Sequence, residues 1–230
     1  MIVLGIDTSD YANALGVVDG GRVLAEVNYP AATSSIEKIT LNIDDVLRRA
    51  DLALADIRGI GVGLGPGSWT GIRIGVTVGK MLAFSLNIPV AGVSTLEVLA
   101  YGVHKESRPV IAVIDVGAGD TVYAAKYRTS FESVELVEDY YVGGIDGLAS
   151  LVTEPAVVIG TRARDYARDI SEKSGIEVDA VEARPRGAAV AILAERRLSR
   201  GDSDDVLSLT PLYLKESTAK AFVNKYRGSH

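Results

Sequence analysis

Over the first 30 residues, apolar positions either run together in short blocks or alternate with polar ones, and this pattern predicts β-strands. Residues 2–6 and 14–18 are apolar blocks, and residues 22–28 alternate. Residues 19–21, Asp-Gly-Gly, join the last two strands, and glycine readily adopts the positive φ angles that a tight hairpin turn needs. The chain therefore begins with three strands, the second and third joined as a hairpin.

The hydrophobic period then changes to that of a helix. Between residues 35 and 50, apolar side chains recur three or four positions apart and share one helical face: Ile36, Ile39, Ile43, Val46 and Leu47. The remaining pattern of the first half predicts a buried strand (57–62), a glycine-rich turn, a second helix (71–87), a strand (89–93) and a short helix (95–102). The predicted order is βββαβα.

The second half of the chain repeats this beginning. Residues 111–115, Ile-Ala-Val-Ile-Asp, align with residues 3–7, Val-Leu-Gly-Ile-Asp, at an offset of 108 positions. Further strands are predicted at 122–127, 134–137, 156–160 and 176–181, with helices at 162–174 and 187–200. Two matching halves indicate a duplicated α/β fold.

Equivalent strands that end in aspartate resemble the way in which the actin/hexokinase/Hsp70 (ASKHA) type of fold builds its nucleotide cleft. We therefore expect a duplicated βββαβα actin-like fold with two subdomains, at residues 1–104 and 105–218. Residues 219–230 are expected to form a tail, and its last three residues, Gly-Ser-His, look like the remnant of an added tag.

Composition excludes several classes of function. The 230 residues carry 24 Lys and Arg against 30 Asp and Glu, a net charge of −6, and an acidic chain is a poor solitary binder of nucleic acid. Cysteine is absent, and the two histidines, His104 and His230, cannot form an HExxH motif. We therefore expect no metal site and no catalytic residue. The longest uncharged run, residues 81–96, is too short to span a bilayer, so a cytoplasmic protein without a membrane segment is expected.

Residues 59–75 form a glycine-rich segment that matches no phosphate-binding motif. The dinucleotide pattern GxGxxG fails at Ser68 and Thr70, and the P-loop pattern fails at Ile74 and Met81. The nucleophile-elbow pattern GxSxG fails at Pro66. The segment instead predicts a turn, after which Ser68 or Thr70 can cap the next helix.

On that helix, Gly71, Gly75 and Gly79 recur every four residues and leave a bare stripe along one face. Glycine inside a helix costs about 1 kcal/mol relative to alanine, so the close approach of another element should offset the cost. That element is either the chain's own sheet or a partner subunit. If it is a partner, Gly75→Glu should break the complex and leave the chain folded.

Asp7, Thr8 and Ser9 end the first strand, where a phosphate loop lies in active actin-like ATPases, and Asp115 ends the equivalent strand. These four residues are candidate cofactor-binding residues, although Asx and Ser/Thr turns also occur wherever a chain reverses. They define an alternative function as an actin-like ATPase or small-molecule kinase. A peptidase is not supported, because no nucleophile and base can be paired.

The glycine-rich turn also resembles a known family. Residues 64–75 read Leu-Gly-Pro-Gly-Ser-Trp-Thr-Gly-Ile-Arg-Ile-Gly, close to the GPGSFTGLRIG signature of the bacterial TsaB (YeaZ) proteins. Residues 4–9, the Ile-Asp and Val-Tyr pairs at 114–115 and 122–123, and residues 211–215 fit the same family. The signature turn comprises Gly65, Pro66, Gly67, Ser68, Trp69 and Thr70.

The resemblance implies a non-catalytic partner of a paralogous metal-binding subunit, TsaD, which transfers a threonylcarbamoyl group to adenosine 37 of tRNA. It also implies a TsaE-type ATPase as a further partner, and tRNA contacted through the complex. The isolated chain is expected to form a homodimer and to bind no cofactor alone, with ATP or ADP held, if at all, at the complex interface. Two departures weaken any claim of a nucleotide or metal site: residues 32–35 lack a histidine, and Asp115-Val-Gly replaces Asp-Ala-Arg.

The resemblance also places the partner surface. We expect helices 35–50 and 71–87 to bind the TsaD-type subunit and to stabilise its competent conformation. The predicted interface residues are Ile36, Ile39, Ile43, Leu47, Gly71, Gly75 and Gly79. The basic runs at 184–186 and 196–200 could add tRNA contacts, but are expected to be solvated helix edges.

Overall fold

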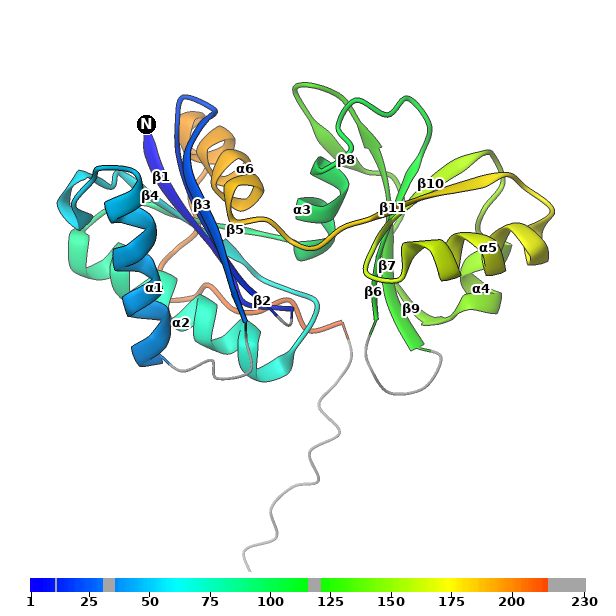
Figure 1. The fold of residues 1–230 in the computed structure, drawn as a ribbon, viewed down its shortest axis with the longest axis horizontal. Helices are drawn as coiled ribbons and strands as arrows, with labels where there is room; N and C mark the ends of the chain where they lie inside the picture. The colour runs from blue at the N-terminus through cyan, green and yellow to red at the C-terminus, as the bar shows by residue number, and fades with distance from the viewer. Residues whose placement is uncertain (11, 31–35, 116–120, 215–230) are drawn as a thin grey trace, which may run out of the picture.

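Two mixed β-sheets, each flanked by helices, give the molecule two lobes (Figure 1). The structure is a computed structural model that describes residues 1–10, 12–30, 36–115 and 121–214. Its order of elements is that of a duplicated α/β fold, as the sequence predicted.

The first sheet has the strand order β3-β2-β1-β4-β5. The first three strands are antiparallel neighbours, and β4 and β5 continue parallel to β1. Two helices, α1 (Ile36–Arg49) and α2 (Trp69–Leu86), pack against it, with a short 3-10 turn η2 (Leu54–Asp56) before β4. The strands are β1 (Ile2–Asp7), β2 (Ala12–Asp19), β3 (Arg22–Pro30), β4 (Gly59–Gly63) and β5 (Val90–Val93).

The second sheet repeats this order as β8-β7-β6-β10-β11, with β9 pairing β7. Its first strand, β6, starts 108 positions after β1, so the duplication has the predicted offset. Helices α4 (Ile145–Ser150) and α5 (Ala163–Ser174) pack in this lobe. The strands are β6 (Val110–Asp115), β7 (Thr121–Thr129), β8 (Val134–Leu136), β9 (Tyr141–Gly144), β10 (Ala156–Gly160) and β11 (Val178–Glu182).

Two helices each pack on the sheet of the opposite half of the chain, so the packing differs from the predicted domain boundary. Helix α3 (Thr95–Tyr101), assigned from sequence to the first subdomain, packs mainly on β6 and β7 of the second sheet. Helix α6 (Gly187–Ser199), assigned to the second, packs on β1, β2 and β4 of the first. A boundary at residue 104 divides the sequence into its two repeats, but it does not separate the two packed lobes.

Small residues allow α6 to approach the first sheet closely. A Cβ atom on Gly16 of β2 would lie 2.2 Å from the backbone nitrogen of Ala188, and one on Gly5 of β1 would lie 2.3 Å from the carbonyl oxygen of Gly187. Side chains at these positions would hold the helix away from the sheet. The helix therefore seals the face of the first sheet opposite α1 and α2, while the predicted tail, 219–230, lies outside the described residues.

Candidate functional site

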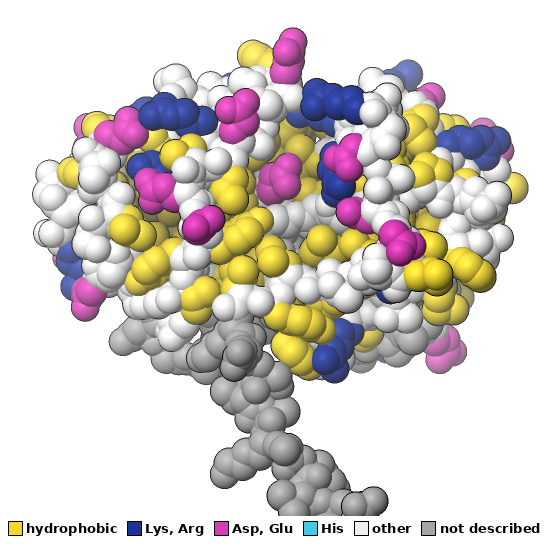
Figure 2. Space-filling model, turned by 180° about the vertical axis from the view of Figure 1, so that it is seen from behind, with side chains coloured by type: hydrophobic (Ala, Val, Ile, Leu, Met, Phe, Trp, Pro, Cys, Tyr) yellow, Lys and Arg dark blue, Asp and Glu magenta, His cyan; other side chains and the backbone are white. Residues whose placement is uncertain are grey.

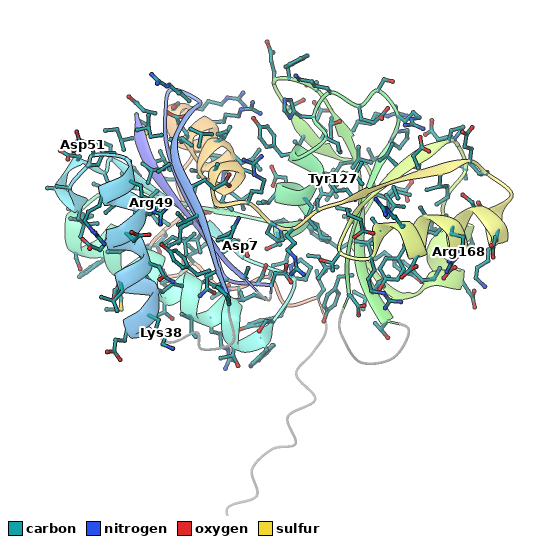
Figure 3. The ribbon with its side chains drawn as sticks, viewed as in Figure 1. Asp7, Lys38, Arg49, Asp51, Tyr127 and Arg168 are labelled. Carbon is teal, nitrogen blue, oxygen red and sulfur yellow. The ribbon has the colours of Figure 1, made fainter. Side chains whose placement is uncertain are left out.

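Asp7, at the end of β1, is fully buried (Figure 3). One carboxylate oxygen accepts hydrogen bonds from the backbone nitrogen and the hydroxyl of Ser9, at 2.8 and 2.5 Å. The other accepts the hydroxyl of Thr95 at 2.9 Å. Burial raises the pKa of the carboxyl group, while these hydrogen bonds oppose the shift. Asp7 therefore ties the turn after β1 to the start of α3 and offers no oxygen atom to a ligand.

Thr8 and Ser9 are also engaged in internal contacts. The Thr8 hydroxyl donates to the carbonyl oxygen of Gly71 at 2.6 Å, and the Ser9 carbonyl accepts the Ser68 amide at 2.7 Å. Both residues are buried, at 1% and 5% exposure. The segment predicted as a phosphate loop therefore packs against the signature turn. Asp7 and Thr8, which the alternative ATPase hypothesis requires to contact a nucleotide, are both buried.

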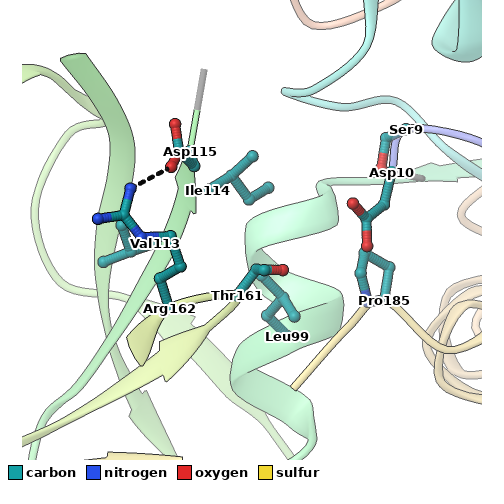
Figure 4. Close-up of a pocket in the computed structure, with 9 residues that line it drawn as sticks. All are labelled: Ser9, Asp10, Leu99, Val113, Ile114, Asp115, Thr161, Arg162 and Pro185. Atoms are coloured by element: carbon teal, nitrogen blue, oxygen red, sulfur yellow. Dashed lines mark hydrogen bonds and ion pairs between the residues drawn. The ribbon is translucent and has the colours of Figure 1, made fainter. Parts of the chain in front are cut away.

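Asp115, the equivalent residue of the second lobe, lies at the edge of a cavity of about 190 Å³ between the lobes (Figure 4). Its carboxylate accepts hydrogen bonds from Arg162 at 3.0 Å and from the Tyr166 hydroxyl at 2.9 Å. Burial raises the pKa of Tyr166 to about 12, and the bond to Asp115 adds to the shift. Ser9 and Asp10 line the opposite wall.

This cavity is smaller than the roughly 300–1,000 Å³ of a typical small-molecule site. On the first-lobe side of the cavity, the Asp10 carboxylate forms an ion pair with Arg184 at 2.8 Å. No group of three or more His, Cys, Asp or Glu residues able to hold a metal ion occurs in the part of the chain that the structure describes. Of the four predicted cofactor-binding residues, only Ser9 and Asp115 line this cavity.

The signature turn joins β4 to α2 and is fixed on several sides. The Gly65–Pro66 peptide bond is cis, and Gly65 has a φ angle of +91°. The carbonyl of Gly65 accepts the Thr95 amide at 2.8 Å. Ser68 caps α2 by accepting the Gly71 amide at 3.2 Å, as the sequence predicted, whereas Thr70 is exposed.

The glycine stripe of α2 faces the chain's own sheet, and this corrects the predicted interface. A Cβ atom on Gly71 would lie 2.0 Å from the Thr8 carbonyl oxygen, and one on Gly75 would lie 2.3 Å from the Thr8 hydroxyl oxygen. On Gly79 it would lie 2.3 Å from a methyl group of Val62. The stripe is bare because the turn after β1 and strand β4 pass so close to the helix.

The apolar stripe of α1 is likewise internal. Ile39, Ile43 and Leu47 are 0%, 4% and 3% exposed in the first-lobe core. The side chain of Ile36, the fourth residue predicted there, lies outside the described set. The six described residues of the predicted interface are thus buried inside the chain. An amphipathic pattern predicts that one face of a helix is buried, but not whether the chain's own core or a partner covers that face.

The outward sides of these helices carry a different set of apolar residues. On α2, Met81 and Phe84 are 56% and 68% exposed; on α1, Leu41 is 64% exposed. Leu207 is 75% exposed in a segment tied to α2, because Lys80 donates to its carbonyl oxygen at 3.0 Å. Figure 2 shows hydrophobic side chains at the right-hand edge, over the lobe that holds these helices, as well as across the middle of that view.

The basic runs are largely paired within the chain. Arg184 pairs with Asp10 and Arg186 with Glu26, on the connection between β11 and α6. In the second run, Arg196 donates to the Phe131 carbonyl and Arg197 pairs with Asp202 and Asp204. These contacts hold α6 and its flanking segments in place.

Comparison with known proteins agrees with the fold and the signature turn. The family model for TsaD, tRNA N6-adenosine threonylcarbamoyltransferase, matches residues 29–183. The tRNA threonylcarbamoyladenosine biosynthesis protein TsaB of Bacillus subtilis is 31% identical over 228 residues, which cover 96% of this chain and 97% of that protein.

Solved structures agree with this family and with the fold. YeaZ from Pseudomonas aeruginosa superposes with a TM-score of 0.79 at 27% identity, over 93% of this chain and 99% of that one. The ROK hexokinase of Thermus thermophilus has a TM-score of 0.55 at 16% identity, over 86% and 100% of the two chains, which shows a shared fold. No helix among the described residues is long and apolar enough to cross a membrane. The chain belongs to the TsaB (YeaZ) family of tRNA threonylcarbamoyladenosine biosynthesis.

Proposed function

We propose that this chain is a non-catalytic subunit of the assembly that transfers a threonylcarbamoyl group to adenosine 37 of tRNA, and that it binds a TsaD-type catalytic subunit. The observation that carries the role is the outward apolar face of α2, where Met81 and Phe84 are more than half exposed. Together with Leu41 and Leu207, these residues form what we call the α1/α2 outer face. Exposed apolar patches on soluble proteins mark association sites.

The proposed contribution to rate is a population shift. A subunit that binds only the competent conformation of its partner raises the population of that conformation. The chain then accelerates the transfer without contacting the reacting atoms. The internal bonds of Asp7 support this role, because the first of the two strand-end carboxylates is committed to the fold.

The other partners follow from the same assembly. A TsaE-type ATPase completes it, and any ATP or ADP binds at the interface between subunits. The catalytic subunit supplies most tRNA phosphate contacts, which agrees with the net charge of −6 and with the paired arginines before α6 and in its last turn. Alone, the α1/α2 outer face pairs with a second copy as a homodimer.

A drop-out reconstitution tests the role. The catalytic subunit, TsaE, tRNA, ATP and threonylcarbamoyl-adenylate are incubated with and without this chain, and modified adenosine is counted. We expect product to be lost on omission, and the chain alone to turn over no ATP. Unchanged product would contradict the proposal, and ATP turnover by the isolated chain would support the alternative kinase function.

A pair of phenylalanines tests the surface. Phe84 of α2 is 68% exposed and Phe131 of the second lobe is 67% exposed, so glutamate at either position should leave the chain folded. We expect Phe84→Glu to abolish binding of the catalytic subunit and to leave the free chain monomeric, as sedimentation would report. Phe131→Glu should bind normally. Equal effects of the two variants would place the interface elsewhere.

A further inference from the structure

Three side chains form a fixed and exposed cluster at the N-terminal end of α2. The rings of Trp69 and Tyr213 have centroids 4.2 Å apart, tilted by 32°. The guanidinium carbon of Arg73 lies 4.3 Å from the centroid of Trp69, and its Nε donates to the Tyr213 hydroxyl at 2.9 Å. Both aromatic residues remain about 40% exposed (39% and 41%). We call these three residues the arginine platform.

The charge of the platform has no partner in the described chain. No Asp or Glu lies within ion-pair distance of Arg73 among the described residues, and α2 contains none between positions 69 and 86. The exposed arginines of α1 differ, since Arg48 and Arg49 pair with Asp44 and Asp45. In Arg73, Nε is the nitrogen that binds Tyr213, so the two terminal nitrogens keep their N–H groups for another acceptor.

The platform is held rigid by a segment that runs antiparallel to α2. Lys80 donates to the carbonyl oxygens of Leu207 and Leu209 at 3.0 and 2.8 Å. Further along this segment, the Leu212 amide donates to the Leu64 carbonyl at 2.8 Å, just before Tyr213 reaches Arg73. Binding to a pre-ordered arginine costs less side-chain entropy than binding to a free one.

The platform is also continuous with the α1/α2 outer face. Positions three or four apart share one side of a helix, and five of the exposed positions of α2 follow that spacing: Trp69, Arg73, Thr77, Met81 and Phe84. One side of the helix therefore presents a stacked cation at one end and large apolar side chains at the other. Such a surface suits a protein partner better than RNA, which requires several cations along a backbone.

We propose that the arginine platform binds a surface carboxylate of the TsaD-type subunit, and so fixes the register of the α1/α2 outer face on its partner. This inference rests on the proposed function. A guanidinium stacked on an aromatic ring still offers its planar fork, which matches a carboxylate through two parallel hydrogen bonds. Tryptophan, tyrosine and arginine are also the residue types that contribute most to binding at interfaces.

The test measures the affinity of the purified chain for the catalytic subunit. Arg73→Gln removes the charge and should weaken binding about 10- to 100-fold, as expected for the loss of a charged hydrogen-bonded contact at an interface. Arg73→Lys keeps the charge but not the fork, and should recover only part of the loss. Arg200→Gln, an exposed arginine outside the face with no side-chain partner among the described residues, should bind normally. The loss should shrink as salt is raised.

The outcomes separate this inference from the function on which it rests. If Phe84→Glu abolishes binding while Arg73→Gln has no effect, the interface is correct and the carboxylate contact is wrong. If neither variant affects binding, the surface itself is wrong. If Arg73→Gln keeps full affinity for the catalytic subunit but lowers tRNA binding by the complex, the platform is an RNA contact and the proposal is overturned. A carboxylate-to-lysine change on the partner that rescues Arg73→Glu would identify the contact and support it.

Discussion

Glu97 is a carboxyl group placed where the two lobes meet, with few groups to stabilise its charge. Burial raises its pKa from 4.5 to about 7, and the nearby Arg197 only partly opposes the shift. Ser94 Oγ and the Tyr127 hydroxyl are buried without a hydrogen-bond partner among the described atoms. Burial raises the pKa of Tyr127 as well, and the charge of Glu97 is among the further causes. An ionised Glu97 therefore destabilises the contact of α3 with the second sheet.

The sign of the pH dependence follows from this shift. Between pH 4.5 and about 7 the folded chain binds more protons at Glu97 than the unfolded chain does, so stability falls as pH rises through that window. Glu97→Gln removes the titration. We expect it to stabilise the chain by about 1–3 kcal/mol at pH 8 and to have little effect at pH 4.5, measured by urea unfolding. Exposed Glu172→Gln should show no such trend, and a Glu97→Gln effect equal at both pH values would contradict the assignment.

At the scale of elements, the packing of α2 on the first sheet depends on Gly75. An added methyl group would lie 2.3 Å from the Thr8 hydroxyl oxygen, which is already held by its bond to the Gly71 carbonyl. Gly75→Ala should therefore destabilise the chain by about 1–3 kcal/mol in spite of alanine's higher helix propensity. Thr77→Ala, on the exposed side of the same helix, should change stability by less than about 0.5 kcal/mol. Chemical denaturation of both variants measures the difference.

Gly75→Glu gives the sharper result. From the sequence alone, this variant is expected to break a complex and leave the chain folded if the glycine stripe faces a partner. Because Gly75 contacts Thr8 instead, we expect the isolated chain to unfold. A folded Gly75→Glu chain that had lost only its partner would show that the helix moves away from the sheet more readily than its packing indicates.

Elements were predictable from sequence where local chemistry determines them. The offset of 108 between β1 and β6 and the Ser68 cap follow from strand patterns and turn residues close together in the chain. Short elements such as β9, with the sequence Tyr-Val-Gly-Gly, carry too little pattern to be recognised. Contacts between distant residues were missed for a different reason. The spacing of Gly71, Gly75 and Gly79 shows that something comes close, but not that it is Thr8, and nothing local links Arg73 to Tyr213.

At the scale of the whole molecule, α3 connects the two lobes. Its Val98 belongs to the apolar cluster under α6 in the first lobe, whereas Leu96 and Leu99 belong to the cluster under β6 and β7 in the second. Val134 of β8 packs against both clusters. Because one short helix is part of two cores, neither lobe can lose its packing without exposing apolar surface of the other.

This arrangement predicts that the two lobes unfold as one unit. Leu99 is 2% exposed, so Leu99→Ala should cost about 2–5 kcal/mol, and hydrogen exchange should show the same loss of protection in β1 and β4 as in β6 and β10. Leu41→Ala, at an exposed position of α1, should leave both sets of amides unchanged. Loss of protection confined to β6 and β10 would mean that the lobes unfold separately. A subunit that unfolds as one body presents the α1/α2 outer face to its partner only when the second lobe is also folded, so core variants there should weaken partner binding as well.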